Sequence, residues 1–175
     1  MVLLILLLLI LVVGTFGGWV AHRLGHSKWR CLSKLHKQHH RLYPPRRLLT
    51  EAYTTHKGWD TSVLAIPIVA LLVGGLLLGA LSLGLISVWE CVGLALVSSL
   101  IGFAHEWLHR EFHKSEAATE PTQAPKMIPV FLLRRTVWFK RLQVFHLQHH
   151  RQPDRNFGLL TTLWDKVFKS GSKKP

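Results

Sequence analysis

Residues 61–104 read TSVLAIPIVALLVGGLLLGALSLGLISVWECVGLALVSSLIGFA and contain one charged side chain, Glu90. The stretch is too long for one membrane helix, which needs about 20 apolar residues, and it is long enough for two. Glycine and serine residues lie near its middle, where a tight turn would fall. It therefore predicts a transmembrane hairpin with helices near 62–80 and 84–104. A hairpin buried in a soluble protein is the alternative, which the length and the lack of charge disfavour.

A second apolar stretch runs from Val2 to Val20 and carries no charge. It is long enough for a further membrane helix near 2–20. A cleaved signal peptide would need a basic region before it and a small-residue cleavage site after it, and the sequence offers neither. We therefore expect an uncleaved anchor.

The basic residues give the chain an orientation. All 22 Lys and Arg residues fall in two blocks, 21–60 and 105–175, and the hairpin tip has none. Basic flanking segments favour the cytoplasmic side of a membrane. We therefore expect three spans, with the N-terminus outside and both blocks in the cytoplasm. Membrane orientation and contact with anionic lipid then account for the net charge of +13, so we expect no nucleic-acid partner.

Twelve histidines are the second unusual feature, and all lie outside the apolar stretches. Ten form the clusters HRLGH, HKQHH, HEWLH and HLQHH, which contain His22, His26, His36, His39, His40, His105, His109, His146, His149 and His150. Spacings of three and four residues place the side chains of each cluster on one face of a helix. His113 follows His109 by one more turn and is a possible further ligand, whereas His56 is predicted to be a surface residue.

These clusters indicate a metal site. Neutral imidazole binds zinc, copper, iron and nickel, and ten rings suit two ions better than one. Two alternatives belong to other classes of protein. HEWLH also fits the zinc-protease signature, with Glu106 as the base, but a protease leaves most other clusters without a role. The second alternative is a non-enzymatic metal-binding or transport protein. Transporters, however, usually place their ligands near the bilayer midplane.

The order of the clusters resembles the fatty acid hydroxylase superfamily, which includes sterol desaturases and carotenoid hydroxylases. Its pattern is HxxxH or HxxxxH, HxxHH, a transmembrane hairpin, HxxxH and HxxHH. The segment NFGLLTTLWDKVF, residues 156–168, is similar to the family's ending. The resemblance covers about residues 18–168 and implies an all-α integral membrane protein, in which a cytoplasmic helical cap carries a histidine-rich two-metal site.

The expected domain is single and covers residues 1–175. Its cytoplasmic histidine segments are 21–60 and 105–168, and 169–175 form a basic tail. Within it, residues 114–129 predict a polar, proline-rich linker. Residues 130–145, basic and aromatic together, predict a helix at the membrane interface that leads into the last cluster.

The resemblance implies an oxidoreductase that hydroxylates or desaturates a C–H bond of a lipid or isoprenoid through two iron ions, which zinc can replace. A carotenoid hydroxylase is the alternative within the superfamily. Dioxygen is the implied co-substrate, and an acidic carrier such as a ferredoxin or cytochrome b5 would supply electrons to the basic cytoplasmic face. Four residues are candidates for accepting a hydrogen bond from the N–H of an imidazole ligand, on the side of the ring away from the metal: Glu106, Glu111, Asp154 and Asn156.

Overall fold

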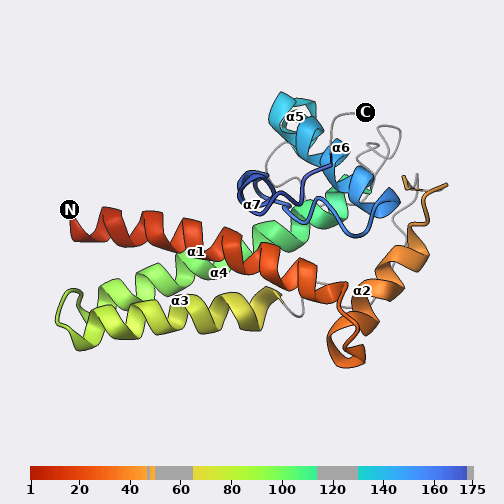
Figure 1. Ribbon diagram of the computed structural model, residues 1–175. Helices are drawn as coiled ribbons and strands as arrows, with labels where there is room; N and C mark the ends of the chain where they lie inside the picture. The colour runs from red at the N-terminus through yellow and green to blue at the C-terminus, as the bar shows by residue number, and fades with distance from the viewer. Residues whose placement is uncertain (47, 50–64, 114–129, 173–175) are drawn as a thin grey trace.

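The computed structural model describes residues 1–46, 48–49, 65–113 and 130–172 (Figure 1). Every regular element in these residues is a helix, which confirms the all-α prediction for the described chain. The helices are α1 (Val2–Gly25), α2 (Arg30–Leu42), α3 (Ala65–Ser82), α4 (Val88–Phe112), α5 (Val130–Arg135), α6 (Val137–Arg151) and α7 (Leu163–Val167). His56 and the predicted linker at 114–129 lie outside the described residues.

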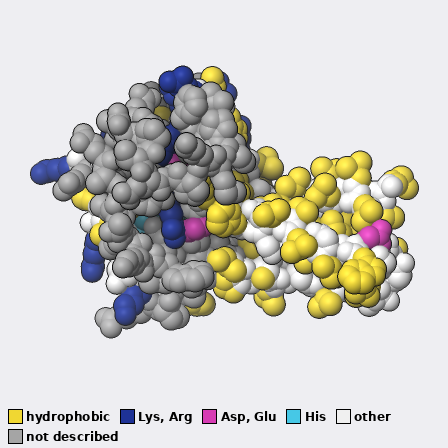
Figure 2. Space-filling model, turned by 180° about the vertical axis from the view of Figure 1, so that it is seen from behind, with side chains coloured by type: hydrophobic (Ala, Val, Ile, Leu, Met, Phe, Trp, Pro, Cys, Tyr) yellow, Lys and Arg dark blue, Asp and Glu magenta, His cyan; other side chains and the backbone are white. Residues whose placement is uncertain are grey.

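Helices α1, α3 and α4 lie side by side as an elongated bundle, with the N-terminus and the α3–α4 turn at the same end (Figure 1). Their core includes Ile10, Val73 and Leu77, which are almost fully buried. Many other large apolar side chains point outward, among them Leu71 and Phe103, and Figure 2 shows this part of the surface as predominantly hydrophobic. Of the described helices, α1 and α4 are long and apolar enough to cross a membrane, and α3 is a shorter apolar helix.

The turn between α3 and α4 follows from its local sequence. Gly84 has φ +66°, a left-handed conformation that glycine adopts without steric cost. Ser87 then caps α4: its Oγ accepts from the Glu90 N–H at 3.3 Å, and its own N–H donates to Glu90 Oε2 at 2.7 Å. This capping box explains why α4 begins at Val88, later than the predicted start near residue 84.

At the other end of the bundle, α2, α5, α6 and α7 gather around the ends of α1 and α4 (Figure 1). A second apolar cluster joins α6 to the end of α4, through Leu108, Phe112, Phe139, Leu142 and Leu159. The predicted helix at 130–145 is divided into α5 and α6. Thr136 separates them, because its Oγ1 accepts from the Phe139 N–H at 3.2 Å and caps α6.

Candidate metal centre

Nine imidazoles form two groups at the end of the bundle where α2, α5, α6 and α7 gather. Within each group, one nitrogen of every ring lies within 4.8 Å of the others. The five-histidine group consists of His39, His109, His113, His146 and His150. The four-histidine group consists of His22, His26, His36 and His149. Each group draws rings from three or more segments of the chain, so neither group forms until these segments have packed together.

Helical geometry divides the two HxxHH clusters between the groups. On α6, His146 and His150 are one turn apart and enter the five-histidine group, whereas His149 points to the four-histidine group. The same division occurs on α2, where His39 and His36 belong to different groups. Both helices therefore border the two sites and contribute rings to each.

The four-histidine group contains two rings whose tautomers follow from their partners. His22 Nδ1 lies 2.7 Å from the Phe157 carbonyl oxygen, and His149 Nδ1 lies 2.6 Å from that of Arg155. A carbonyl oxygen only accepts, so each Nδ1 carries the proton and each neutral ring keeps a lone pair on Nε2. These two Nε2 atoms are 2.9 Å apart. Lone pairs facing each other at this distance repel, and a cation between or beside them removes the conflict.

The five-histidine group repeats this arrangement. His113 Nδ1 donates to the Leu48 carbonyl at 2.9 Å, and His150 Nδ1 donates to the Tyr43 carbonyl at 3.0 Å. The Nε2 atom of His39 lies 3.2 Å from that of His113 and 3.0 Å from that of His150. An imidazole that binds a metal usually donates its other N–H to a carbonyl or carboxylate, which orients the ring. Both groups show this feature.

Burial keeps these rings neutral. It lowers the pKa of His149 from 6.5 to about 4, and burial with repulsion from His149 lowers the pKa of His26 to about 2. Burial, followed by neighbouring imidazoles, holds the pKa well below the ordinary value in four more rings: His36, His39, His146 and His150. At neutral pH these rings therefore offer lone pairs and not charges.

The donor set fits a pair of transition-metal ions. Within the described residues, both groups consist of imidazoles alone, a donor type that suits iron, zinc, copper and nickel. Four and five nitrogens are suitable numbers for one ion each. The buried, neutral and preoriented rings are in the state that metal binding requires.

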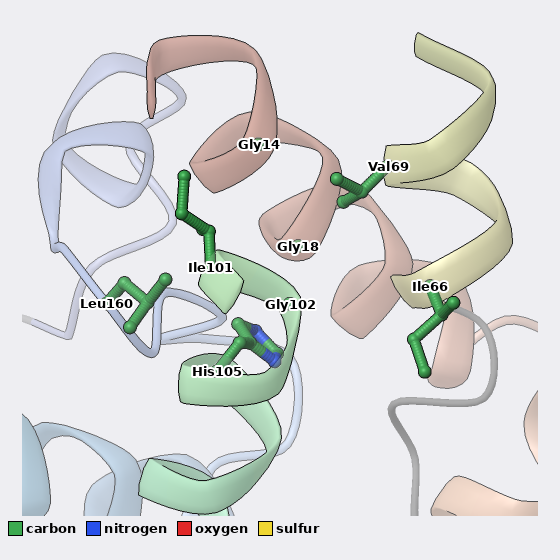
Figure 3. Close-up of a pocket in the computed structure, with 8 residues that line it drawn as sticks. All are labelled: Gly14, Gly18, Ile66, Val69, Ile101, Gly102, His105 and Leu160. Atoms are coloured by element: carbon green, nitrogen blue, oxygen red, sulfur yellow. The ribbon is translucent and has the colours of Figure 1, made fainter. Parts of the chain in front are cut away.

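The structure places two predicted ligands outside these groups. His40 lies at the edge of the four-histidine group, with its Nε2 3.1 Å from those of His36 and His149. His105 belongs to neither group and faces α1, where a Cβ added to Gly18 would lie 3.0 Å from its Nε2. It lines a largely apolar pocket with residues of α1, α3, α4 and the segment before α7: Gly14, Gly18, Ile66, Val69, Ile101, Gly102 and Leu160 (Figure 3).

The α4 pair that enters the five-histidine group is therefore HREFH, with His109 and His113, and not HEWLH. Both pairs have the same spacing, and the sequence predicts His113 only as a possible ligand. Periodicity identifies the helix face but does not show which turn of α4 lies level with α2 and α6.

The predicted supporting carboxylates differ in their surroundings. Glu106 pairs with Arg110 at 2.7 Å, Glu111 is buried against Arg134, and Asp154 is exposed. Backbone carbonyls orient four of the imidazoles. The sequence could not identify them, because every residue has a carbonyl group.

The described chain thus combines long apolar helices with buried imidazole groups that could hold metal ions. A family model described as "Fatty acid hydroxylase" matches residues 7–170, nearly the whole chain. The chain therefore belongs to the fatty acid hydroxylase family, a family of oxidoreductases of the hydroxylase and desaturase type. No curated protein and no solved structure matches the chain significantly.

Proposed function

We propose that this chain is an oxygen-dependent hydroxylase or desaturase that acts on a C–H bond of a lipid at a pair of histidine-bound iron ions. The observation that carries the proposal is the pair of neighbouring imidazole groups. In each group, rings whose Nδ1–H donates to a backbone carbonyl direct unprotonated Nε2 atoms toward one another. When bound, the iron pair supplies the activation of dioxygen, with electrons from a separate protein. Zinc can occupy the same ligands.

The chain's own residues would bind and orient the ions and exclude water. The five-histidine group would hold one ion and the four-histidine group the other, with His40 beside the second. Aromatic side chains shield both groups: Phe112 lies 5.7 Å from His146 between ring centroids, and Phe157 lies 5.6 Å from His149. Exclusion of water strengthens electrostatic interactions in the site and protects reactive species from side reactions.

The position of the site supports a lipid substrate. Gly18 precedes His22 by four residues on α1, and His105 precedes His109 by four on α4, so the pocket in Figure 3 lies about one helical turn, roughly 5.4 Å, from two site histidines. Its lining is mostly apolar. The cavity is small, with space for about one water molecule, so an alkyl chain, or the isoprenoid chain of a carotenoid, would have to widen it to reach the site.

Lipid analysis tests the reaction directly. Cells that express the wild-type chain should contain a lipid with an added hydroxyl group or double bond, and cells that express His149→Ala should lack it. Identical lipid profiles in the two strains, with both proteins present in the membrane, would contradict the proposal.

The described geometry gives less support to a zinc protease. A protease needs His105 and His109 on one ion with Glu106 beside it, but His105 packs against Gly18 and Glu106 binds Arg110. A metal transporter is also less well supported, because the histidine groups lie at one end of the bundle and not near its middle.

We also propose that α3 is a third membrane helix, that the N-terminus lies outside, and that the single domain has its metal centre on the cytoplasmic side. An acidic electron carrier would then meet exposed basic residues of α2 and α6, such as Arg41, Arg141 and Arg151. Reversal of these three charges should slow electron transfer and weaken its dependence on salt. Unchanged rates and unchanged salt dependence would refute the acidic carrier.

A further inference from the structure

One short segment anchors metal-site rings from two distant helices. The carbonyl of Arg155 accepts from His149 of α6, and the carbonyl of Phe157 accepts from His22 of α1. The Nε2 atoms of these rings are the pair that lies 2.9 Å apart. The position of residues 155–157 therefore determines the directions in which the two lone pairs point.

A buried carboxylate fixes this segment. Asp165 is 1% exposed. Its Oδ1 accepts from the Phe157 N–H at 2.9 Å, and its Oδ2 accepts from the Gly158 N–H at 2.7 Å. The same peptide segment thus binds Asp165 through its N–H groups and His22 through a carbonyl. The residue at 158 must be small, because a Cβ there would lie 2.7 Å from Asp165 Oδ2.

The carboxylate also joins the segment to α1. Trp19 Nε1 donates to Asp165 Oδ1 at 3.2 Å, and Ser170 Oγ donates to the same oxygen at 2.6 Å. Trp19 lies about one turn before His22 on α1, so Asp165 holds both the helix that carries the ring and the carbonyl that orients it. Four donors satisfy the carboxylate, which would otherwise be costly to bury.

Asn156 fixes the segment from its other side. It is fully buried with φ 60°, a conformation that asparagine tolerates better than most residues. Its Oδ1 accepts from the Ser172 N–H at 2.7 Å, and its Nδ2 donates to the Phe145 carbonyl of α6 at 3.3 Å. The two anchored carbonyls therefore lie on either side of a residue that is itself held in place.

We infer that Asp165 is a positioning residue for the metal ion of the four-histidine group. It acts through Phe157 on His22, touches neither the metal nor the substrate, and has no corresponding contact with the five-histidine group in the described residues. The inference rests on the proposed function only in requiring that both groups bind metal. It gives the aspartate of the LWDKV segment a role beyond local packing.

The test is anaerobic Fe(II) binding to the purified full chain, in competition with a chelator, for wild type and Asp165→Asn. Asparagine has nearly the same shape, but it replaces one accepting oxygen with an NH₂ group that faces an N–H donor. We expect one of the two sites to bind Fe(II) about 10- to 100-fold more weakly and the other to keep its affinity, the usual effect of losing support behind a ligand.

Ser170→Ala is the matched control. It removes one donor to the same carboxylate and leaves the bonds to Phe157 and Gly158 intact, so both sites should bind Fe(II) as in wild type. Asn156→Gly is a second test, because glycine accepts the positive φ and lacks the side-chain anchors. It should weaken the same single site, and it carries the test if Asp165→Asn does not fold.

Two results would overturn the inference while leaving the proposed function intact. One is wild-type Fe(II) binding at both sites in folded Asp165→Asn. The other is equal weakening of both sites, which would make Asp165 a residue of general stability. A wild-type chain that binds no Fe(II) would instead contradict the proposed function, and this inference with it.

Discussion

His22 and His149 are 127 positions apart in the sequence, yet their Nε2 atoms lie 2.9 Å apart. Each ring donates its Nδ1 hydrogen to a backbone carbonyl, so both Nε2 atoms meet as acceptors. This contact joins the first helix to the last histidine cluster. Binding of a cation between or beside these rings would explain why the fold brings two lone pairs together.

HEWLH and HREFH, the two possible pairs of metal ligands on α4, give opposite predictions for the metal content of variants. His113→Ala should reduce bound metal from two ions per chain to one, because His113 belongs to the five-histidine group. His105→Ala should keep both ions, because His105 lies against Gly18 and belongs to neither group. Elemental analysis of both proteins, purified in parallel, measures the difference. Loss of an ion only in His105→Ala would restore HEWLH as the ligand pair.

Gly25 allows α1 to approach α2 closely. A Cβ at this position would lie 2.9 Å from Cγ of His36, so Gly25→Ala must displace the ring. We expect a loss of about 1–3 kcal/mol in the free energy of unfolding, the usual cost of overpacking, and weaker metal binding. Thermal unfolding in detergent and metal analysis provide the measurements.

Gly75→Ala in α3 is the control for that substitution, because within the described residues no atom outside the local backbone of α3 lies within 4 Å of the added Cβ. It should leave metal content unchanged and stabilise the helix by up to about 1 kcal/mol. Equal behaviour of the two variants would show that the close approach of α1 to His36 does not affect the site.

The metal-free protein should lose stability in mildly acidic solution. Burial lowers the pKa of His149 from 6.5 to about 4, and that of His26 to about 2. Below pH 6.5 the unfolded chain therefore binds protons that the folded chain does not, so the free energy of unfolding falls as the pH falls from about 6.5 toward 4. Denaturant unfolding at several pH values checks this. A stability that stays constant or rises across this range would show that the rings are already protonated in the fold.

Glu106→Gln distinguishes the oxygenase from the protease. Glu106 forms an ion pair with Arg110 one turn away, and such surface pairs contribute only about 0.3–0.5 kcal/mol. We therefore expect this variant to retain both ions and most of its lipid-modifying activity, and His36→Ala to lose that activity. Turnover in lipid extracts measures both variants. Loss of function in Glu106→Gln together with normal function in His36→Ala would favour the protease.

The predictable part of this architecture depends on periodic patterns. The apolar run before and after the turn at Gly84 predicted α3 and α4, and histidines at helical spacing predicted shared faces on α2 and α6. The family was also identifiable, because the order of the clusters and the ending from Asn156 together are specific. These features are local, or they follow from the order of local features along the chain.

The features that the sequence does not predict depend on how the helices and loops pack against one another. HEWLH and HREFH are equivalent by spacing, and only the packing of α4 against α2 and α6 distinguishes them. The role of Asp165 depends on a contact with Trp19 across 146 positions. The carbonyls that orient His22 and His149 have no signal in the sequence, because any residue could provide them.

Anaerobic iron binding is the most direct test of the central claim that two histidine groups hold two ions. Purified wild-type chain should bind two Fe(II) ions, and His22→Ala and His113→Ala should each bind one, because each removes a ring from a different group. A folded wild-type chain that binds a single ion would contradict the claim. Loss of the same ion in both variants would contradict it equally.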